Sequence, residues 1–286
     1  MSAQELRPMG IGDILDTTFR LYRQRFLVFL LIALVVYLPF GVFMGVYEAM
    51  MPKPSPYAAS TAYSSHQATD FRFQEHGRAV FPKADPQAAI MAGSVALVGI
   101  FLFMVVLVPL CSAALIENIS ASYLGETLSA GASYGRAAHR LLPLLWTEII
   151  AGVATMVGYV FCIVPGVIFS LWFLLIAPVV VLERTNGSTA MGRSRQLMQG
   201  NLGKGFSLML VVALLAFAVN FALGAVIGLV PWPHVALRAF VQNIVPAVLL
   251  PIQTAPAILL YYDLRIRKEA FDLQKLSEAL GQPATT

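Results

Sequence analysis

The chain has 286 residues, of which 58% are hydrophobic and only 12% are charged, with a formal net charge of +4. A soluble globular domain has about 25% charged residues, so this chain has roughly half of the charge that a water-facing surface uses. The composition excludes an ordinary soluble enzyme, a disordered chain and a disulfide-stapled secreted domain. It also excludes a nucleic-acid binder of the usual kind, because 19 basic residues against 15 acidic ones make no dense basic patch. What remains is a protein embedded in a lipid bilayer.

Six segments are long and apolar enough to cross a membrane, which predicts an all-α, polytopic bundle. A bilayer core about 30 Å thick requires roughly 20 apolar residues in a helix. We expect spans at about residues 26–47, 88–116, 144–164, 166–182, 206–230 and 244–262. The run from Leu142 to Leu182 has about the length of two spans, so we interpret it as a hairpin that turns at Pro165-Gly166. Five spans are the alternative, if 166–182 is re-entrant.

The basic residues are divided unevenly between the two sides that these spans define. With the N-terminus inside, 14 of the 19 lie on the inner side: Arg7, Arg20, Arg23, Arg25, Arg136, Arg140, Arg184, Arg193, Arg195, Lys204, Arg265, Arg267, Lys268 and Lys275. The other 5 lie outside: Lys53, Arg72, Arg78, Lys83 and Arg238. Because basic residues concentrate in cytoplasmic segments, we expect both termini in the cytoplasm. No cleavage site follows the first apolar run, so we expect no cleaved signal peptide.

The two sides also differ in their loops. Outside, residues 51–87 form a proline-rich loop, which we expect to be a semi-ordered, solvated cap rather than a partner-binding segment. Inside, a helix-capping residue precedes an arginine by seven positions three times: Asp13 and Arg20, Ser129 and Arg136, Ser188 and Arg195. This spacing predicts a surface helix before each odd-numbered span, with the arginines facing anionic lipid or a partner. Either the chain is a three-fold repeat of helical hairpins or the matching spacing is chance.

Four polar residues within or beside the spans form a candidate intramembrane site. Asn220 and Gln253 lie near the middle of the fifth and sixth spans, and we expect both to face the bundle interior. There they either clamp neighbouring helices or line a substrate path. Glu117 and Glu148 lie near the inner ends of the second and third spans, where a carboxylate either serves a ligand or proton or pairs with Arg136 or Arg140.

Glycines and prolines indicate how the spans pack. The pairs Gly41/Gly45 and Gly224/Gly228 have the small-residue spacing that lets helices approach closely, and we expect them to serve packing within the bundle. The sixth span contains three prolines, Pro246, Pro251 and Pro256, each of which removes a backbone donor and favours a bend. Bent helices are common in transporters, although membrane helices generally tolerate proline.

No motif predicts catalysis. The sequence contains no H-E-x-x-H, no G-x-S-x-G and no Cys/His set at metal-ligand spacing. Cys111 and Cys162 fall inside apolar spans, where we expect them to pack as small hydrophobic side chains. We therefore predict a protein that is not an enzyme and that holds no metal or cofactor.

Stretches at both ends and in the middle of the chain resemble one family. The chain opens with LRPMGIGDILD at 6–16 and FRLYR at 19–23, and closes with LYYDLRIRKEAFDL at 260–273. Between them lie 178–183 and the segment 190–200, which includes Arg193-Ser194. These stretches resemble the bacterial glycerophosphoryl diester phosphodiesterase membrane-domain family and related domains of unknown function. The resemblance covers nearly the whole chain and implies a protein of the bacterial inner membrane.

The family name comes from relatives in which the membrane domain is fused to a soluble phosphodiesterase. This sequence carries no such domain, and His139-Arg140-Leu141 is only superficially similar to the start of that enzyme, without its acidic metal ligands. The resemblance therefore argues against the enzymatic activity. We expect a scaffold, assembly or regulatory component, with membrane lipids and other membrane proteins as its candidate partners. A transporter or lipid-handling permease with a polar path between bent helices is the alternative, and an intramembrane phosphodiesterase is the least supported.

Overall fold

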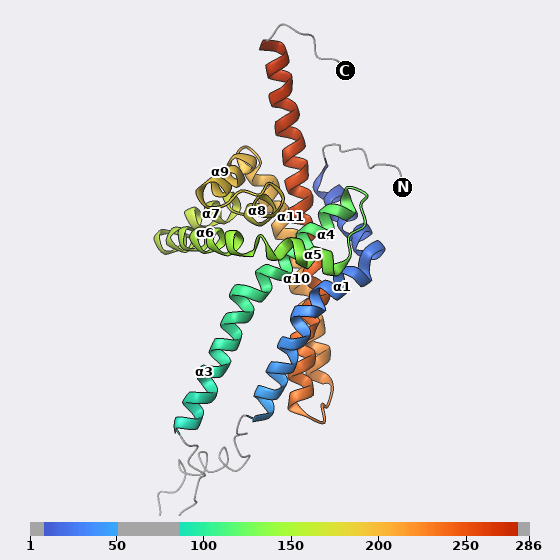
Figure 1. Cartoon of the computed structure of the whole chain (residues 1–286), viewed down its shortest axis with the longest axis vertical. Helices are drawn as coiled ribbons and strands as arrows, with labels where there is room; N and C mark the ends of the chain where they lie inside the picture. Colours follow the sequence, from blue (N-terminus) through green and yellow to red (C-terminus); the bar gives the residue numbers. More distant parts are fainter. Residues whose placement is uncertain (1–8, 51–85, 280–286) are drawn as a thin grey trace, which may run out of the picture.

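A computed structural model describes residues 9–50 and 86–279, and every regular element in these ranges is helical (Figure 1). The long elements are α1 (Ile11–Met50), α3 (Pro86–Leu102), which continues through a π-helical turn at Phe103–Leu107 into α4 (Val108–Tyr123), α6 (Leu141–Phe161), α10 (Leu202–Leu229) and α11 (Val235–Ala279). The short ones are α5 (Ala130–Ala138), α7 (Ile163–Trp172), α8 (Ile176–Leu182) and α9 (Gly187–Met198). Within the described ranges, six helical stretches are long and apolar enough to cross a membrane. The predicted all-α membrane bundle is confirmed.

The centre of the bundle is the contact between α1 and α11. Gly41 and Gly45 are both buried there, and a Cβ atom on Gly45 would lie 3.1 Å from the carbonyl oxygen of Ala236. The first small-residue pair therefore serves packing within the bundle, as expected. The second pair does not, because a Cβ atom on Gly224 or Gly228 would meet no described atom within 4 Å.

Helix α1 consists of two helices joined at a kink. Arg25 has φ −120° and ψ 21°, so residues 11–24 form one segment and the apolar run from Phe26 forms the next. Ile14 and Leu21, on the apolar stripe of the first segment, are buried. The predicted helix ahead of the first span is thus present, with its apolar face packed against the protein.

Helices α6 and α7 form the expected hairpin, but its turn is displaced from the predicted position. The chain reverses at Cys162, whose φ of −171° and ψ of 153° are those of an extended residue. Pro165-Gly166 was the wrong position for the turn, because both residues lie within the first turns of α7. Gly158 and Gly166 instead allow the two helices to touch, since a Cβ atom on Gly158 would lie 3.1 Å from the Cα atom of Gly166.

The segment expected as the fourth span is divided into two short helices. α7 has 10 residues and α8 has 7, with a break at residues 173–175 between them. Neither piece alone has the roughly 20 residues that a bilayer crossing requires, although together they are long and apolar enough. The break at residues 173–175 resembles the re-entrant segment of the five-span alternative, in which residues 166–182 do not cross the membrane.

The direction of α6 also departs from that of a regular bundle. α1, α3, α10 and the first half of α11 run along the length of the molecule, whereas α6 runs across them (Figure 1). By length and composition α6 qualifies as a span. Its orientation, which depends on how the hairpin packs against α8 and α9, is not that of its neighbours.

Helix α11 is continuous through Pro246, Pro251 and Pro256 and extends past the rest of the bundle (Figure 1). Its last part and the first turn of α1 lie at the same end of the molecule, which we call the terminal face. The proline-rich segment 51–85 lies outside the described residues, so the expectation of a cap there stays a prediction.

The three expected capping residues behave differently. The Ser129 side chain accepts a hydrogen bond from the backbone N–H of Ala132 at 3.3 Å, which confirms it as the cap of α5. Asp13 and Ser188 are wrong as caps, because α1 and α9 each begin before them. The shared cap-to-arginine spacing therefore does not reflect a shared structure, and it gives no support to a three-fold repeat.

Candidate functional site

The carboxylate of Asp263, on α11, is the most enclosed charge among the described residues. Its side chain has no exposed surface, and three donors surround it. The Met9 backbone N–H donates to Oδ1 at 2.6 Å, Lys204 Nζ donates to Oδ2 at 2.5 Å, and Arg267 Nε donates to both oxygens at 3.0 and 3.1 Å. A buried carboxylate is stable when opposite charges and hydrogen bonds replace the water that it loses.

Met9 completes this arrangement through its other backbone group. Its carbonyl oxygen accepts hydrogen bonds from Lys204 Nζ at 2.6 Å and from Arg267 at 3.1 Å. Met9, which lies two residues before the start of α1, is therefore fixed to the start of α10 and to α11. The contact joins positions 254 residues apart in the chain.

A second charged cluster fixes α8 and α9 to α11. Arg193 Nε donates to both oxygens of Glu183 at 3.1 and 3.0 Å, and its Nη2 atom lies 2.7 Å from Glu269. Tyr261 donates to Glu183 at 3.0 Å and accepts from Arg265, which also pairs with Glu269 at 3.0 Å. Burial acts to lower the pKa of Arg193, but the hydrogen bonds and charges of the two glutamates outweigh it and raise that pKa. We call the residues of both clusters the polar junction: Met9, Glu183, Arg193, Lys204, Tyr261, Asp263, Arg265, Arg267 and Glu269.

Helix α5 is held to α4 by a smaller set of hydrogen bonds. Buried Asn118 donates to the Ser133 hydroxyl at 2.8 Å and to the Leu128 carbonyl at 3.0 Å. Glu117 lies 3.8 Å from Arg136, so the expected ion pair at the end of the second span is confirmed. Its partner is Arg136, whose side chain is 54% exposed, and the pair is correspondingly weak.

The expectation that Asn220 and Gln253 face the bundle interior is wrong. Both residues are exposed on the surface of the described structure. Asn220 satisfies its amide on its own helix, by donating to the Ala216 carbonyl at 2.7 Å. The sequence indicates how far along each helix the two residues lie but not the side that they face. Asn220 faces outward because α10 has few neighbours and most of its circumference is free.

Glu148 lies in a different place from the other predicted residues. It lines a crevice of about 300 Å³ between α6, α7 and α8, together with the hydroxyl-bearing Thr155 and Ser170. The structure thus separates the four candidate intramembrane residues: Glu117 pairs beside α5, Glu148 lines this crevice, Asn220 is on the outside of α10, and Gln253 lies at a slot between α10 and α11. They do not form the shared polar path that the sequence suggested.

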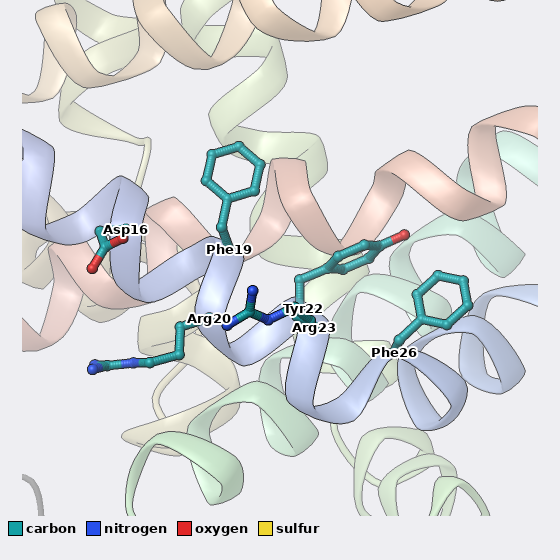
Figure 2. A pocket seen from close by; sticks show the side chains of 6 residues that line it. All are labelled: Asp16, Phe19, Arg20, Tyr22, Arg23 and Phe26. Atoms are coloured by element: carbon teal, nitrogen blue, oxygen red, sulfur yellow. The ribbon is translucent and has the colours of Figure 1, made fainter.

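The three predicted arginines also have separate surroundings. Arg195, on α9, lies over the ring of Trp172, with its guanidinium carbon 4.2 Å from the ring centroid. Arg136 pairs with Glu117, as described above. Arg20, on α1, lines an open groove of about 730 Å³ together with Asp16, Phe19, Tyr22, Arg23 and Phe26 (Figure 2). We call these six residues the basic mouth.

Sequence reasoning missed the polar junction as a site. A signal was present, because Glu183 and Asp263 are acids that directly follow apolar runs and have basic residues close behind them in the chain. Both lie in the stretches that carry the family resemblance, and these stretches meet at the junction through Met9, Glu183, Arg193 and Asp263. Within the described residues no group of three His, Cys, Asp or Glu side chains is placed to hold a metal ion.

The two cysteines differ. Cys111 is buried, with Sγ 3.8 Å from the Ile32 carbonyl, as expected for a small packing residue. Cys162 is exposed at the turn between α6 and α7, so the expectation that it packs in a span is wrong.

Compared with models of protein families, with curated proteins and with solved structures, the chain matches none.

Proposed function

We propose that this chain is a multi-pass protein of a bacterial inner membrane, with cytoplasmic termini, that acts as a scaffold or regulatory component rather than as an enzyme. The observation that carries the proposal is the polar junction. Its charges are paired with one another, and they join the start of α1, α8, α9, the start of α10 and α11. A network in which a buried carboxylate and the charges around it satisfy one another makes a region rigid.

A rigid terminal face suits a scaffold, because a partner that binds preordered helices loses less conformational entropy. Helix α9, which the polar junction fixes, presents Arg195 as an exposed cation, and α5, which is held to α4, presents Arg136. The permease alternative has less support, since Glu117, Glu148, Asn220 and Gln253 are dispersed. We also propose membership of the membrane-domain family described above, because the stretches that carry the resemblance contact one another at the polar junction.

The test is a cross-linked pull-down from native membranes, read by quantitative mass spectrometry. The double variant Arg136→Glu/Arg195→Glu reverses two exposed charges outside the polar junction. We expect its abundance in the membrane to match the unaltered protein and its co-purifying proteins to fall several-fold. Arg238→Glu, an exposed site before the apolar part of α11, is the matched control and should keep them.

Two results would count against the scaffold. One is an identical set of co-purifying proteins from the double variant and from the control. The other is a pull-down in which no protein is enriched over an unrelated membrane protein of the same abundance. If the double variant is itself lost from the membrane, Arg136→Gln/Arg195→Gln, which removes the charges without reversing them, replaces it in the same comparison.

A further inference from the structure

The basic mouth adjoins an apolar slot between α10 and α11. The slot has a volume of about 70 Å³, and its walls include Val212 and Ala216 of α10 and Leu249 of α11. Phe19 lines both the mouth and the slot, so the two hollows adjoin at this ring. The mouth is lined by charged and aromatic side chains, and the slot is lined almost entirely by apolar ones. We call the mouth and the slot together the groove.

The two arginines of the mouth differ from the cations of the polar junction. Arg20 and Arg23 are exposed, and within the described part of the chain neither takes part in an ion pair. By contrast, Arg193, Lys204 and Arg267 each pair with a carboxylate. With Asp16 as the one acid of the mouth, two guanidinium groups leave a net positive charge there.

The aromatic residues of the mouth fit the boundary between headgroups and hydrocarbon. Tyr22 fixes the mouth to α11 by donating to the Val248 carbonyl at 3.0 Å, and its ring packs edge-on against Phe26 at 5.3 Å between centroids. Figure 2 shows the aromatic and guanidinium groups on successive turns of α1. The kink at Arg25 follows directly, where the apolar run of the first span begins. Arginine and aromatic side chains are both characteristic of this interfacial zone.

We propose that this groove binds one anionic phospholipid, with its phosphate at Arg20 and Arg23 and part of one acyl chain in the apolar slot. A guanidinium group matches a phosphate by paired hydrogen bonds as well as by charge. The slot excludes a purely ionic ligand as the complete occupant, because its walls are almost entirely apolar. Gln253, whose amide stands at the slot, is placed to donate to a lipid ester carbonyl. This site is separate from the polar junction and does not depend on the scaffold proposal.

The first arm of the test measures headgroup selectivity. The purified full chain in detergent is titrated with phosphatidylglycerol or phosphatidylcholine of identical acyl chains, and bound lipid is counted by native mass spectrometry. We expect tighter binding of phosphatidylglycerol, and a loss of about tenfold or more in Arg20→Gln/Arg23→Gln, since each arginine near an anionic surface contributes measurably to binding. Arg238→Gln is the matched control and should bind as the unaltered protein does.

The second arm tests the acyl chain without touching a charge. Ala216→Trp fills the slot, whereas Ala222→Trp makes the same change at an exposed position of α10 that does not line it. We expect Ala216→Trp to weaken phosphatidylglycerol binding and Ala222→Trp to leave it unchanged. Soluble glycerol phosphate, which has the headgroup chemistry but no chain, should not compete at equal concentration.

Several results would overturn the proposal. Equal binding of the two lipids would show that the site does not select an anionic headgroup. Full competition by glycerol phosphate would show that the site binds a free anion. Unchanged binding in Ala216→Trp would show that the acyl chain of the lipid does not occupy the slot. The melting temperature of each variant in detergent is measured alongside. If Arg20→Gln/Arg23→Gln melts early, Arg20→Lys/Arg23→Lys replaces it, and we expect a partial loss of phosphatidylglycerol binding. If Ala216→Trp melts early, Ala216→Phe replaces it, and we expect a substantial loss of that binding.

Discussion

The most apolar stretches of α6 and α11 have nearly equal mean hydropathy, 1.7 and 1.8, but the two helices have opposite positions in this protein. In its most apolar stretch α11 is 50% buried, whereas α6 is 22% buried and runs across the bundle (Figure 1). The two helices differ in the side chains through which they contact their neighbours. α11 presents Tyr261 and Asp263 to partners on α8, α10 and the segment before α1, whereas α6 carries large apolar side chains such as Met156 and Phe161 on exposed positions.

Hydropathy reports the affinity of a helix for lipid and not its position within a bundle. Lipid chains are as apolar as leucine, so an apolar surface has no need to be covered by protein. A polar or charged group within a span does need a partner. Helix α11, whose Asp263 is paired with residues of other segments, therefore lies at the centre, and α6, which exposes mostly apolar side chains, lies outside.

Whether α6 crosses the membrane is the most direct test of the difference between the two helices. If α6 and α7 lie across the bundle, the turn at Cys162 does not reach the face where α10 and α11 are joined. In a Cys111→Ala background, we expect a membrane-impermeant maleimide applied to that face to label Cys162 negligibly. His234→Cys, in the exposed α10–α11 connection of a variant that also carries Cys162→Ala, should label fully. Equal labelling of the two positions would restore a regular up-and-down hairpin.

The largest expected change in stability comes from Asp263 on α11. Asp263→Ala leaves Lys204, Arg267 and the Met9 N–H without their acceptor, and we expect a loss of about 2–3 kcal/mol in the free energy of unfolding. Unfolding by SDS in mixed micelles, followed by tryptophan fluorescence, measures it. Asp16→Ala, at an exposed acid, should cost less than about 0.5 kcal/mol. Similar losses in the two variants would remove the special role of the buried carboxylate.

A leucine truncation compares the packing of the two helices directly. Leu259 on α11 is fully buried, whereas Leu142 on α6 is 78% exposed. Leu259→Ala leaves a cavity, and we expect it to cost about 2 kcal/mol in the same assay. Leu142→Ala exchanges one lipid-facing side chain for another and should have almost no effect. A substantial loss in Leu142→Ala would indicate that α6 is covered in the membrane, for example by a second protein.

The smallest expected effect concerns a matched pair of tyrosines. Tyr261→Phe removes the hydroxyl that bonds Glu183 and Arg265, and we expect a cost of about 1 kcal/mol. Tyr159→Phe on α6 removes a hydroxyl that contacts only Ser170 on an exposed surface, and should cost less than about 0.5 kcal/mol. The same SDS titration ranks them. The reverse order would show that the hydroxyl of the polar junction is dispensable.

Part of the candidate site was accessible to sequence reasoning. The ion pair between Glu117 and Arg136 follows from one carboxylate at the end of an apolar run and one arginine in the next short helix. The cap at Ser129 follows from local backbone geometry. Both involve residues close in the chain, where local rules are sufficient.

The side that a membrane helix presents to its neighbours was not accessible. Asn220 and Gln253 were expected inside because buried amides need partners, yet Asn220 finds its acceptor one turn back on its own helix. The turn at Cys162 was likewise missed, because Pro165-Gly166 carries the stronger local turn signal. Proline is also tolerated in the first turn of a helix, and that is where α7 places it.

The low charge and the long apolar runs of the sequence determined by themselves that the chain belongs in a membrane and that it is helical. They also determined which segments are apolar enough to cross. These are sums over neighbouring residues, and the free energy of transfer to lipid is a local property of each segment. Only the tertiary structure decided that α11 is central, that α6 runs crosswise and that Met9, Lys204, Asp263 and Arg267 meet. Those outcomes depend on pairings between residues far apart in the chain, such as those that satisfy the buried carboxylate of Asp263.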